Sequence, residues 1–244
     1  MVIYLKPATR IRIAAVLSLF LIVLGVRAGL SVQSGTIETA AKIKPISRVD
    51  TSLLEVGLVV DVTSGGPEEV MACLAVLDEL EVKATWFLTA TLVEAGETPV
   101  KELTSRGHEV GVKGTDEKRI DNLPQAEMLD RIQRARQAFM KIAVPTAPFF
   151  YPPGERYSDA LVAIAFQEGY QSIKAAVDLS GMKGKEADAA RKIAERISPG
   201  DILKIRVDKK GIMPAEKYLA SLIPQLKGMN LSVVSLSQLF KGVR

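Results

Sequence analysis

The sequence predicts an α/β protein built on a parallel β-sheet. From Glu55 onward, short apolar and β-branched runs alternate with amphipathic segments of helical period, as in chains whose parallel strands are joined by helices. The first run ends in an acidic residue, Asp61, and a Ser/Gly/Gly/Pro turn after it opens a helix. Seven such units fit one closed or nearly closed barrel, although an open doubly wound sheet has the same alternation.

Strands are predicted, in chain order, from runs rich in β-branched and aromatic residues. They cover Glu55–Val62, Ala84–Thr89, His108–Gly114, Ala147–Tyr151, Ser172–Val177, Asp201–Val207 and Leu231–Leu236. Pro152, Pro153 and Gly154 end the fourth of them, and the Pro199-Gly200 pair precedes the sixth.

Helices are predicted in the intervening segments. Pro67 stands in the first turn of the first helix, where Glu68 and Glu69 favour the positive end of the helix dipole. The longest helix covers about Gln125–Ile142, because its apolar residues recur every three or four positions. The others cover Val100–Ser105, Asp159–Gln167, Lys185–Ile197 and a segment opened by Pro214.

The charge of the chain is concentrated at its start. The net charge is +4, from 32 basic and 28 acidic residues, but residues 1–28 hold four basic residues and no acid. The remainder therefore has 28 of each sign, and we expect no nucleic-acid partner. With 244 residues, 48% of them hydrophobic, the chain has ample material for one core.

The first 28 residues have the pattern of a secretory signal peptide. Basic residues are followed by an apolar run over residues 13–26, which would span about 21 Å as a helix, less than the ~30 Å of a bilayer core. An uncleaved signal-anchor helix is the alternative, and any membrane contact is expected only through residues 11–30. In both cases the folded part lies outside the cytoplasm. Residues 29–53 are predicted to be a polar linker, and 54–244 the folded domain.

Two residue types limit the possible chemistry. The single cysteine, Cys73, lies in a helical pattern and is predicted to be a small buried apolar residue. The single histidine, His108, excludes any site that needs two histidines. His108 begins its strand, and we expect a hydrogen-bonded turn residue at the end of the sheet opposite the chemistry.

Four segments, in order, resemble the polysaccharide deacetylase family, also called the NodB-homology or carbohydrate esterase family four. They are Lys83–Leu88, Arg106–Gly111, Phe149–Gly154 and Gly200–Leu203, and the resemblance covers roughly residues 54–240. It implies an irregular (β/α)7 barrel. It also implies removal of acetyl groups from N-acetylated glycans by a divalent metal, such as zinc, that one Asp and two His hold.

The resemblance also implies that the metal ligands are missing here. Asp61 matches the family's catalytic base, but its metal-binding acid falls on Val62. The two ligand histidines, four residues apart, fall on Lys113 and Glu117. We therefore expect no metal cofactor in this chain.

Other family positions are changed as well. The arginine that orients the base falls on Tyr151, the acid histidine falls on Arg206, and Asp178 loosely matches a later acidic position. Lys113 and Arg206 are cations that offer no lone pair to a metal at neutral pH. In one interpretation, these two cations partly replace the charge of the ion. In the other, they are solvated charges at the rim with no shared role.

Three hypotheses follow. The favoured one is a deacetylase relative without activity that binds or scaffolds a cell-wall or other N-acetylated glycan, through Lys113, Glu117, Tyr151 and Arg206. In it, Arg206 grips a carboxylate and Tyr151 offers its ring to a sugar or packs at the strand end. The alternative is an active hydrolase with a rearranged site, in which Asp61, Glu117 or Asp178 supplies the acid and base. The third is a globular domain whose pocket is only residual packing.

Overall fold

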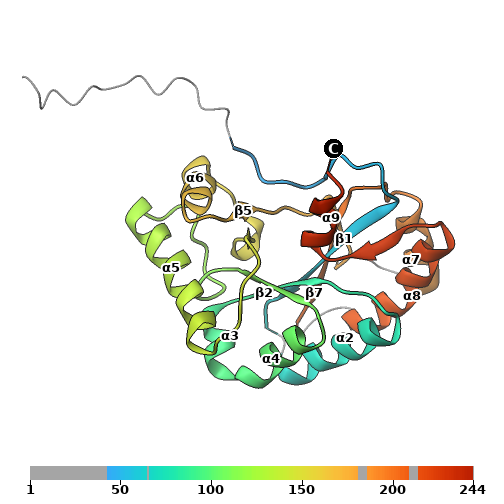
Figure 1. The fold of residues 1–244 in the computed structure, drawn as a ribbon, viewed down its shortest axis with the longest axis horizontal. Helices are drawn as coiled ribbons and strands as arrows, with labels where there is room; N and C mark the ends of the chain where they lie inside the picture. The colour runs from blue at the N-terminus through green and yellow to red at the C-terminus, as the bar shows by residue number, and fades with distance from the viewer. Residues whose placement is uncertain (1–42, 65, 181–185, 209–213, 244) are drawn as a thin grey trace, which may run out of the picture. The chain divides into compact units, whose positions relative to one another are not determined.

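The computed structural model describes residues 43–64, 66–180, 186–208 and 214–243. Within them the strands are β1 Glu55–Val62, β2 Thr85–Leu88, β3 Glu109–Val112, β4 Phe149–Phe150, β5 Gln171–Ser172, β6 Val177–Asp178, β7 Ile202–Val207 and β8 Ser232–Val234. They form one parallel sheet in the order β5-β4-β3-β2-β1-β7-β6, and β8 pairs with the first half of β1. The sheet curls, as Figure 1 shows, and confirms the predicted α/β class and barrel type.

The predicted strand Ser172–Val177 is wrong as a single strand. It is divided between β5, which pairs with β4, and β6, which pairs with β7 at the other edge of the sheet. Between them, Ile173 N–H donates to the Phe150 carbonyl and Ala176 N–H donates to the Ile202 carbonyl. One continuous segment thus bonds to both edges of the sheet, which makes the barrel irregular where it closes.

Helices surround the sheet (Figure 1). They are α2 Pro67–Glu79, α3 Ala90–Ala95, α4 Glu97–Ser105, α5 Gln125–Lys141, α6 Asp159–Gln167, α7 Glu186–Ala194, α8 Ala215–Gly228 and α9 Leu236–Lys241, with a 3-10 turn, η1, over Pro153–Glu155. Contacts between neighbours join them in the order α6-α5-α3-α4-α2-α8-α7. Pro67 and two glutamates open α2, as predicted, whereas the six-residue helices α3 and α9 were too short for their periodicity to be seen.

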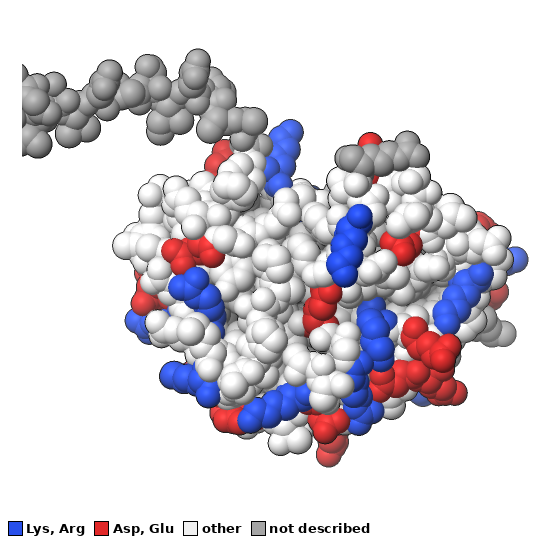
Figure 2. Space-filling model, in the orientation of Figure 1, with Lys and Arg blue, Asp and Glu red and all other residues white. Residues whose placement is uncertain are grey.

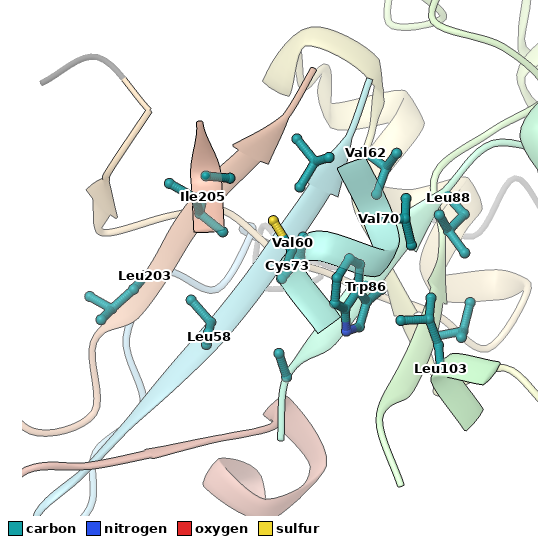
Figure 3. Packing of buried hydrophobic residues seen from close by; sticks show 14 of the residues in the cluster. Leu58, Val60, Val62, Val70, Cys73, Trp86, Leu88, Leu103, Leu203 and Ile205 are labelled. Carbon is teal, nitrogen blue, oxygen red and sulfur yellow. The ribbon is translucent and has the colours of Figure 1, made fainter. Parts of the chain in front are cut away.

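The outer core lies between the sheet and the helices. Alternate residues of β1, Leu58, Val60 and Val62, face the same cluster as Val70 and Cys73 of α2, as Figure 3 shows. Cys73 is a free, fully buried thiol, as predicted, and burial raises its pKa to about 12. This layer fixes which face of each strand points outward, and so which face points into the barrel.

A second, smaller cluster fills the barrel itself. It contains Val59, Phe87 and Tyr151 from the strands and Leu236 and Leu239 from α9. Thr85 and Ser235 donate hydrogen bonds to the two carboxylate oxygens of Glu109, at 2.9 and 2.6 Å. The helix and this small polar cluster lie at the end of the barrel where the strands begin.

Part of the segment predicted as a linker contacts the barrel. Residues 46–51 form isolated bridges that pair Ile46 with Ile173, Arg48 with Asp201 and Thr51 with Val243. The predicted leader, and residues 29–42 of the linker, lie outside the described residues. Of the helices that the structure describes, none combines the length and apolar character that a membrane span requires. On the face drawn in Figure 2, basic and acidic side chains are interspersed.

Candidate functional site

The candidate residues meet because the strands are parallel and their side chains alternate. Outward-facing Val60 and Val62 leave Asp61 on the inward face of β1, and its register partner Arg206 lies on β7. On the same inward face, Lys113 follows β3 and Tyr151 follows β4. The carboxyl ends of the strands therefore bring these four residues, from four separate parts of the chain, to one rim.

Lys113 is a fully buried lysine whose ammonium is surrounded by oxygen atoms. Its Nζ lies 2.6 Å from Asp61 Oδ1, and 2.6 and 2.7 Å from the two carboxylate oxygens of Glu117. The carbonyl of Val62 is the remaining acceptor, at 3.3 Å. Asp61 is also buried, whereas the Glu117 side chain is 36% exposed. The ammonium thus has an acceptor for each of its protons and bridges the ends of β1 and β3.

The electrostatics of this group depend on burial. Burial raises the pKa of Glu117, and the nearby ammonium of Lys113 opposes that rise. Two carboxylates share one ammonium, so Arg206 supplies the second positive charge, with its Nε 3.8 Å from Asp61 Oδ2. The Arg206 side chain is 39% exposed, and its backbone N–H donates to Ser180 Oγ. It is the cation of this group that solvent and ligands can reach.

A second buried lysine lies on the same inward face, two residues before Arg206. Lys204 Nζ is 2.7 Å from Asp178 Oδ2 and also contacts Glu155 Oε1. Burial, with Arg206 and Lys113 nearby, lowers the pKa of Lys204 to about 8. Asp178 thus pairs with Lys204 and not with the Asp61 group. Sequence reasoning missed Lys204 and Glu155, although a lysine at alternate spacing from Arg206 in an apolar strand was a usable signal.

Tyr151 does not lie where a sugar could stack on it. The residue is fully buried, and its ring stacks on Phe87 with centroids 5.2 Å apart and an interplanar angle of 28°. Burial raises the pKa of its hydroxyl, for which the described residues provide no hydrogen-bond partner. Of the two uses considered for Tyr151, the structure matches the packed strand-end residue, because Phe87 covers the ring.

His108 lies at the opposite end of the barrel, as predicted. Its Nδ1 accepts hydrogen bonds from the Trp86 indole and the Ala84 amide, both at 3.2 Å. The proton must then be on Nε2, which lies 3.7 Å from Asp78 Oδ1. Burial, and after it the charge of Lys83, lowers the pKa of His108 to about 4. The residue joins β2 to the turn before β3.

The rim residues do not fit the divalent metal that the resemblance implies. The point nearest to both Asp61 and Glu117 is taken by the Lys113 ammonium, which has no lone pair to donate. Val62, in the position of the metal-binding acid, packs its side chain in the outer core. Within the described ranges, no three His, Cys, Asp or Glu side chains are grouped so as to hold a metal ion. The donor set is instead that of an internal ion pair.

Solved structures with this fold come from carbohydrate esterases and deacetylases. One is a family 4 pseudoenzyme from Bacillus anthracis, with a TM-score of 0.74 and 23% identity, over 82% of this chain and 70% of that one. Another is a peptidoglycan N-acetylglucosamine deacetylase, with a TM-score of 0.73 and 22% identity, over 81% of this chain and 94% of that one. At these identities the likeness establishes the fold.

Sequence comparison assigns the family. The curated peptidoglycan-N-acetylglucosamine deacetylase of Bacillus cereus is 23% identical over 171 residues, which are 68% of this chain and 62% of that protein. The chain therefore spans less than two thirds of that relative. The polysaccharide deacetylase family model matches residues 50–173, which include the ends of the first four strands with Asp61, Lys113, Glu117 and Tyr151. The chain belongs to the polysaccharide deacetylase family.

Proposed function

We propose that this protein binds an N-acetylated glycan of the cell envelope without metal-dependent deacetylation. The observation that carries the proposal is the position of Lys113, whose ammonium lies 2.6 Å from Asp61 and 2.6 Å from Glu117. An ammonium at this point pairs with both carboxylates and competes with any divalent ion for them. Asp61, the residue that matches the family's base, is held in an ion pair.

The rim keeps features that suit binding. Arg206 remains partly exposed beside Asp61, and an arginine can bind carboxylates or sugar hydroxyls through several parallel hydrogen bonds. Lys113 has no exposed surface, so we assign it a role in holding the rim together and not in direct contact with ligand. The name of the Bacillus cereus relative supports an N-acetylglucosamine polymer as ligand, and the Bacillus anthracis pseudoenzyme supports loss of activity within this fold.

Acetate release and glycan binding, measured on the same preparation, test the proposal. The purified protein is incubated with N-acetylglucosamine oligomers, with and without added zinc or cobalt. We expect binding, no acetate release and negligible metal by mass spectrometry. The Arg206→Gln variant should bind more weakly, while Lys217→Gln, at an exposed lysine of α8, is the control. Metal-stimulated release of acetate would overturn the proposal.

A hydrolase with a rearranged site is the second candidate, and Glu117 favours it. Its side chain is partly exposed and burial raises its pKa, the property that a general acid needs near neutral pH. In that case the protein releases acetate without added metal, and Glu117→Gln abolishes the release. If the parent protein binds oligomers and shows no turnover, this candidate is excluded.

We also propose that the domain is exported by residues 1–28. The basic start and the apolar run over residues 13–26 support this, with the leader either cleaved or retained as an anchor. Fusing the chain to a reporter enzyme that is active only outside the cytoplasm tests it. Activity that depends on residues 1–28 is expected, and a fully active fusion without them would contradict the proposal.

A further inference from the structure

A polar hollow lies beside the seam of the barrel, and Asp61 is not among the residues that line it. Its volume is about 570 Å³, in the range of pockets that take one or two sugar rings. Its walls come from residues 44–47, the segment between β3 and α5, the turn after β4 and the second residue after β5. Its charged and aromatic lining residues are Lys44, Asp121, Glu155, Arg156, Tyr157 and Lys174.

Hydrogen bonds hold the walls of this hollow in place. Ile46 N–H donates to the Ser172 carbonyl, and Lys174 N–H donates to the Ile46 carbonyl, both at 2.9 Å. The Tyr157 hydroxyl donates to the Ile173 carbonyl, which places the tyrosine ring along the wall. The site is therefore formed before any ligand arrives, and a ligand does not have to order it.

Basic side chains outnumber acidic ones in the lining of the hollow. Both acidic residues are paired: Asp121 with the guanidinium of Arg119, at 2.8 and 3.0 Å, and Glu155 with Lys204. Lys44, Arg156 and Lys174 are exposed, and none of them forms an ion pair with another described residue. Asp121 has Arg119 as its partner and Glu155 shares Lys204 with Asp178, so the three exposed cations outnumber the two acids of the lining and the hollow attracts anions.

We propose that this hollow binds the carboxylate of an acidic sugar, and that it thereby selects the class of glycan that the protein takes. Lysine and arginine side chains bind carboxylates through charge-assisted hydrogen bonds, and the Tyr157 ring offers an amphipathic face to a sugar ring. Glu155 links the hollow to the rim, because the residue lines the hollow and its carboxylate contacts Lys204, which belongs to the rim. The inference rests on the proposed glycan binding and adds that the bound glycan carries a carboxylate.

Two sugars that differ by one carboxylate provide the test. N-acetylmuramic acid is N-acetylglucosamine with an added lactyl carboxylate. Each is titrated into the ¹⁵N-labelled full chain at low salt. We expect N-acetylmuramic acid to bind about fivefold more tightly, as one or two exposed ion pairs allow. Backbone signals of Tyr157 and Lys174 should shift, and 0.5 M salt should remove most of the preference.

Variants decide whether the hollow is responsible. Arg156→Gln/Lys174→Gln alters two exposed residues and should abolish the preference, while Lys217→Gln on α8 should preserve it. Equal affinity for the two sugars in the parent protein, or a preference that survives in the double variant, would overturn the inference. So would tighter binding of N-acetylglucosamine 6-phosphate, since the hollow would then be a phosphate site. Neutral chitotetraose tests the proposed function separately, because it carries no carboxylate.

Discussion

Lys113 shows how a single side chain can hold the rim of a barrel. Its buried ammonium contacts the carboxylate of Asp61 in β1, the carboxylate of Glu117 in the loop after β3 and a backbone carbonyl. Such a group is stable only while all partners are present, because an unpaired buried charge is costly. At the residue scale, the contact between the ends of β1 and β3 depends on this buried cation.

Removing that cation should destabilise the protein strongly. Lys113→Met leaves Asp61 and Glu117 with Arg206 as their one nearby cation, and we expect a loss of about 3–5 kcal/mol in the free energy of unfolding, measured with urea. Adding Asp61→Asn and Glu117→Gln to this variant removes the uncompensated charges and should recover most of the loss. A Lys113→Met variant as stable as the parent protein would contradict this prediction.

His108 should make stability depend on pH in a defined range. The folded protein takes up the proton only near pH 4, whereas the unfolded chain does so near 6.5. Between these values the unfolded state binds more protons, so stability falls as the pH drops from 6.5 to 4 and is unaffected by this group above 6.5. The full effect is about 3 kcal/mol.

Urea unfolding at pH 7, 5.5 and 4.5 measures the effect. His108→Gln keeps an acceptor toward Trp86 but does not titrate, so its stability should fall less over this range than that of the parent protein. An NMR titration of the imidazole that gives a pKa near 6.5 would contradict the prediction.

At the element scale, β3 lies close to β2 because of a glycine. A Cβ atom at Gly111 would lie 2.3 Å from Cε1 of Phe87, whose ring stacks on Tyr151. The inward rows of β2, β3 and β4 therefore fit together only if position 111 has no side chain. The glycine is required for packing, since its backbone conformation is ordinary.

Gly111→Ala should displace the Phe87 ring and reduce the free energy of unfolding by about 1–3 kcal/mol. Gly228→Ala is the matched control, because its added methyl group meets no atom within 4 Å at the end of α8. That variant should be neutral or slightly stabilised. Chemical denaturation of both variants measures the difference, and equal stability of the two would show that the ring accommodates the methyl group.

Long elements with a regular apolar pattern were predictable from the sequence, whereas short and irregular elements were not. Helix α5 agrees with the sequence because its apolar residues repeat over several turns, and strand β1 agrees because it is a buried run rich in β-branched residues. The segment Ser172–Val177 was predicted as one strand, yet it divides between two edges of the sheet. Its two strands have two residues each, too few to show a period, and their partners, β4 and β7, are distant in sequence.

At the scale of the whole molecule, the rim replaces a removable cation by fixed ones. Lys113, Lys204 and Arg206 lie among Asp61, Glu117, Asp178 and Glu155, so the charges nearly balance within the chain itself. We therefore expect folding to require no bound ion, in contrast to sites whose binding energy is part of the folding energy.

Chelation should therefore leave the stability unchanged. We expect EDTA treatment followed by dialysis to shift the thermal midpoint of unfolding by less than about 1 °C, and added zinc to have no larger effect. A family member with an Asp and two His at the metal is the positive control. A fall of several degrees in this protein would show that a bound ion contributes to its fold.

The sequence by itself determined the alternation of the longer strands and helices, the position of Asp61 at the end of the first strand and the exclusion of a two-histidine metal site, because periodicity and composition are properties of the chain alone. Only the tertiary structure decided that Asp178 pairs with Lys204, that Phe87 covers Tyr151 and that Lys113 is fully buried. Ion pairing and burial depend on which side chains from separate strands come within a few ångströms, and curling of the sheet brings them together.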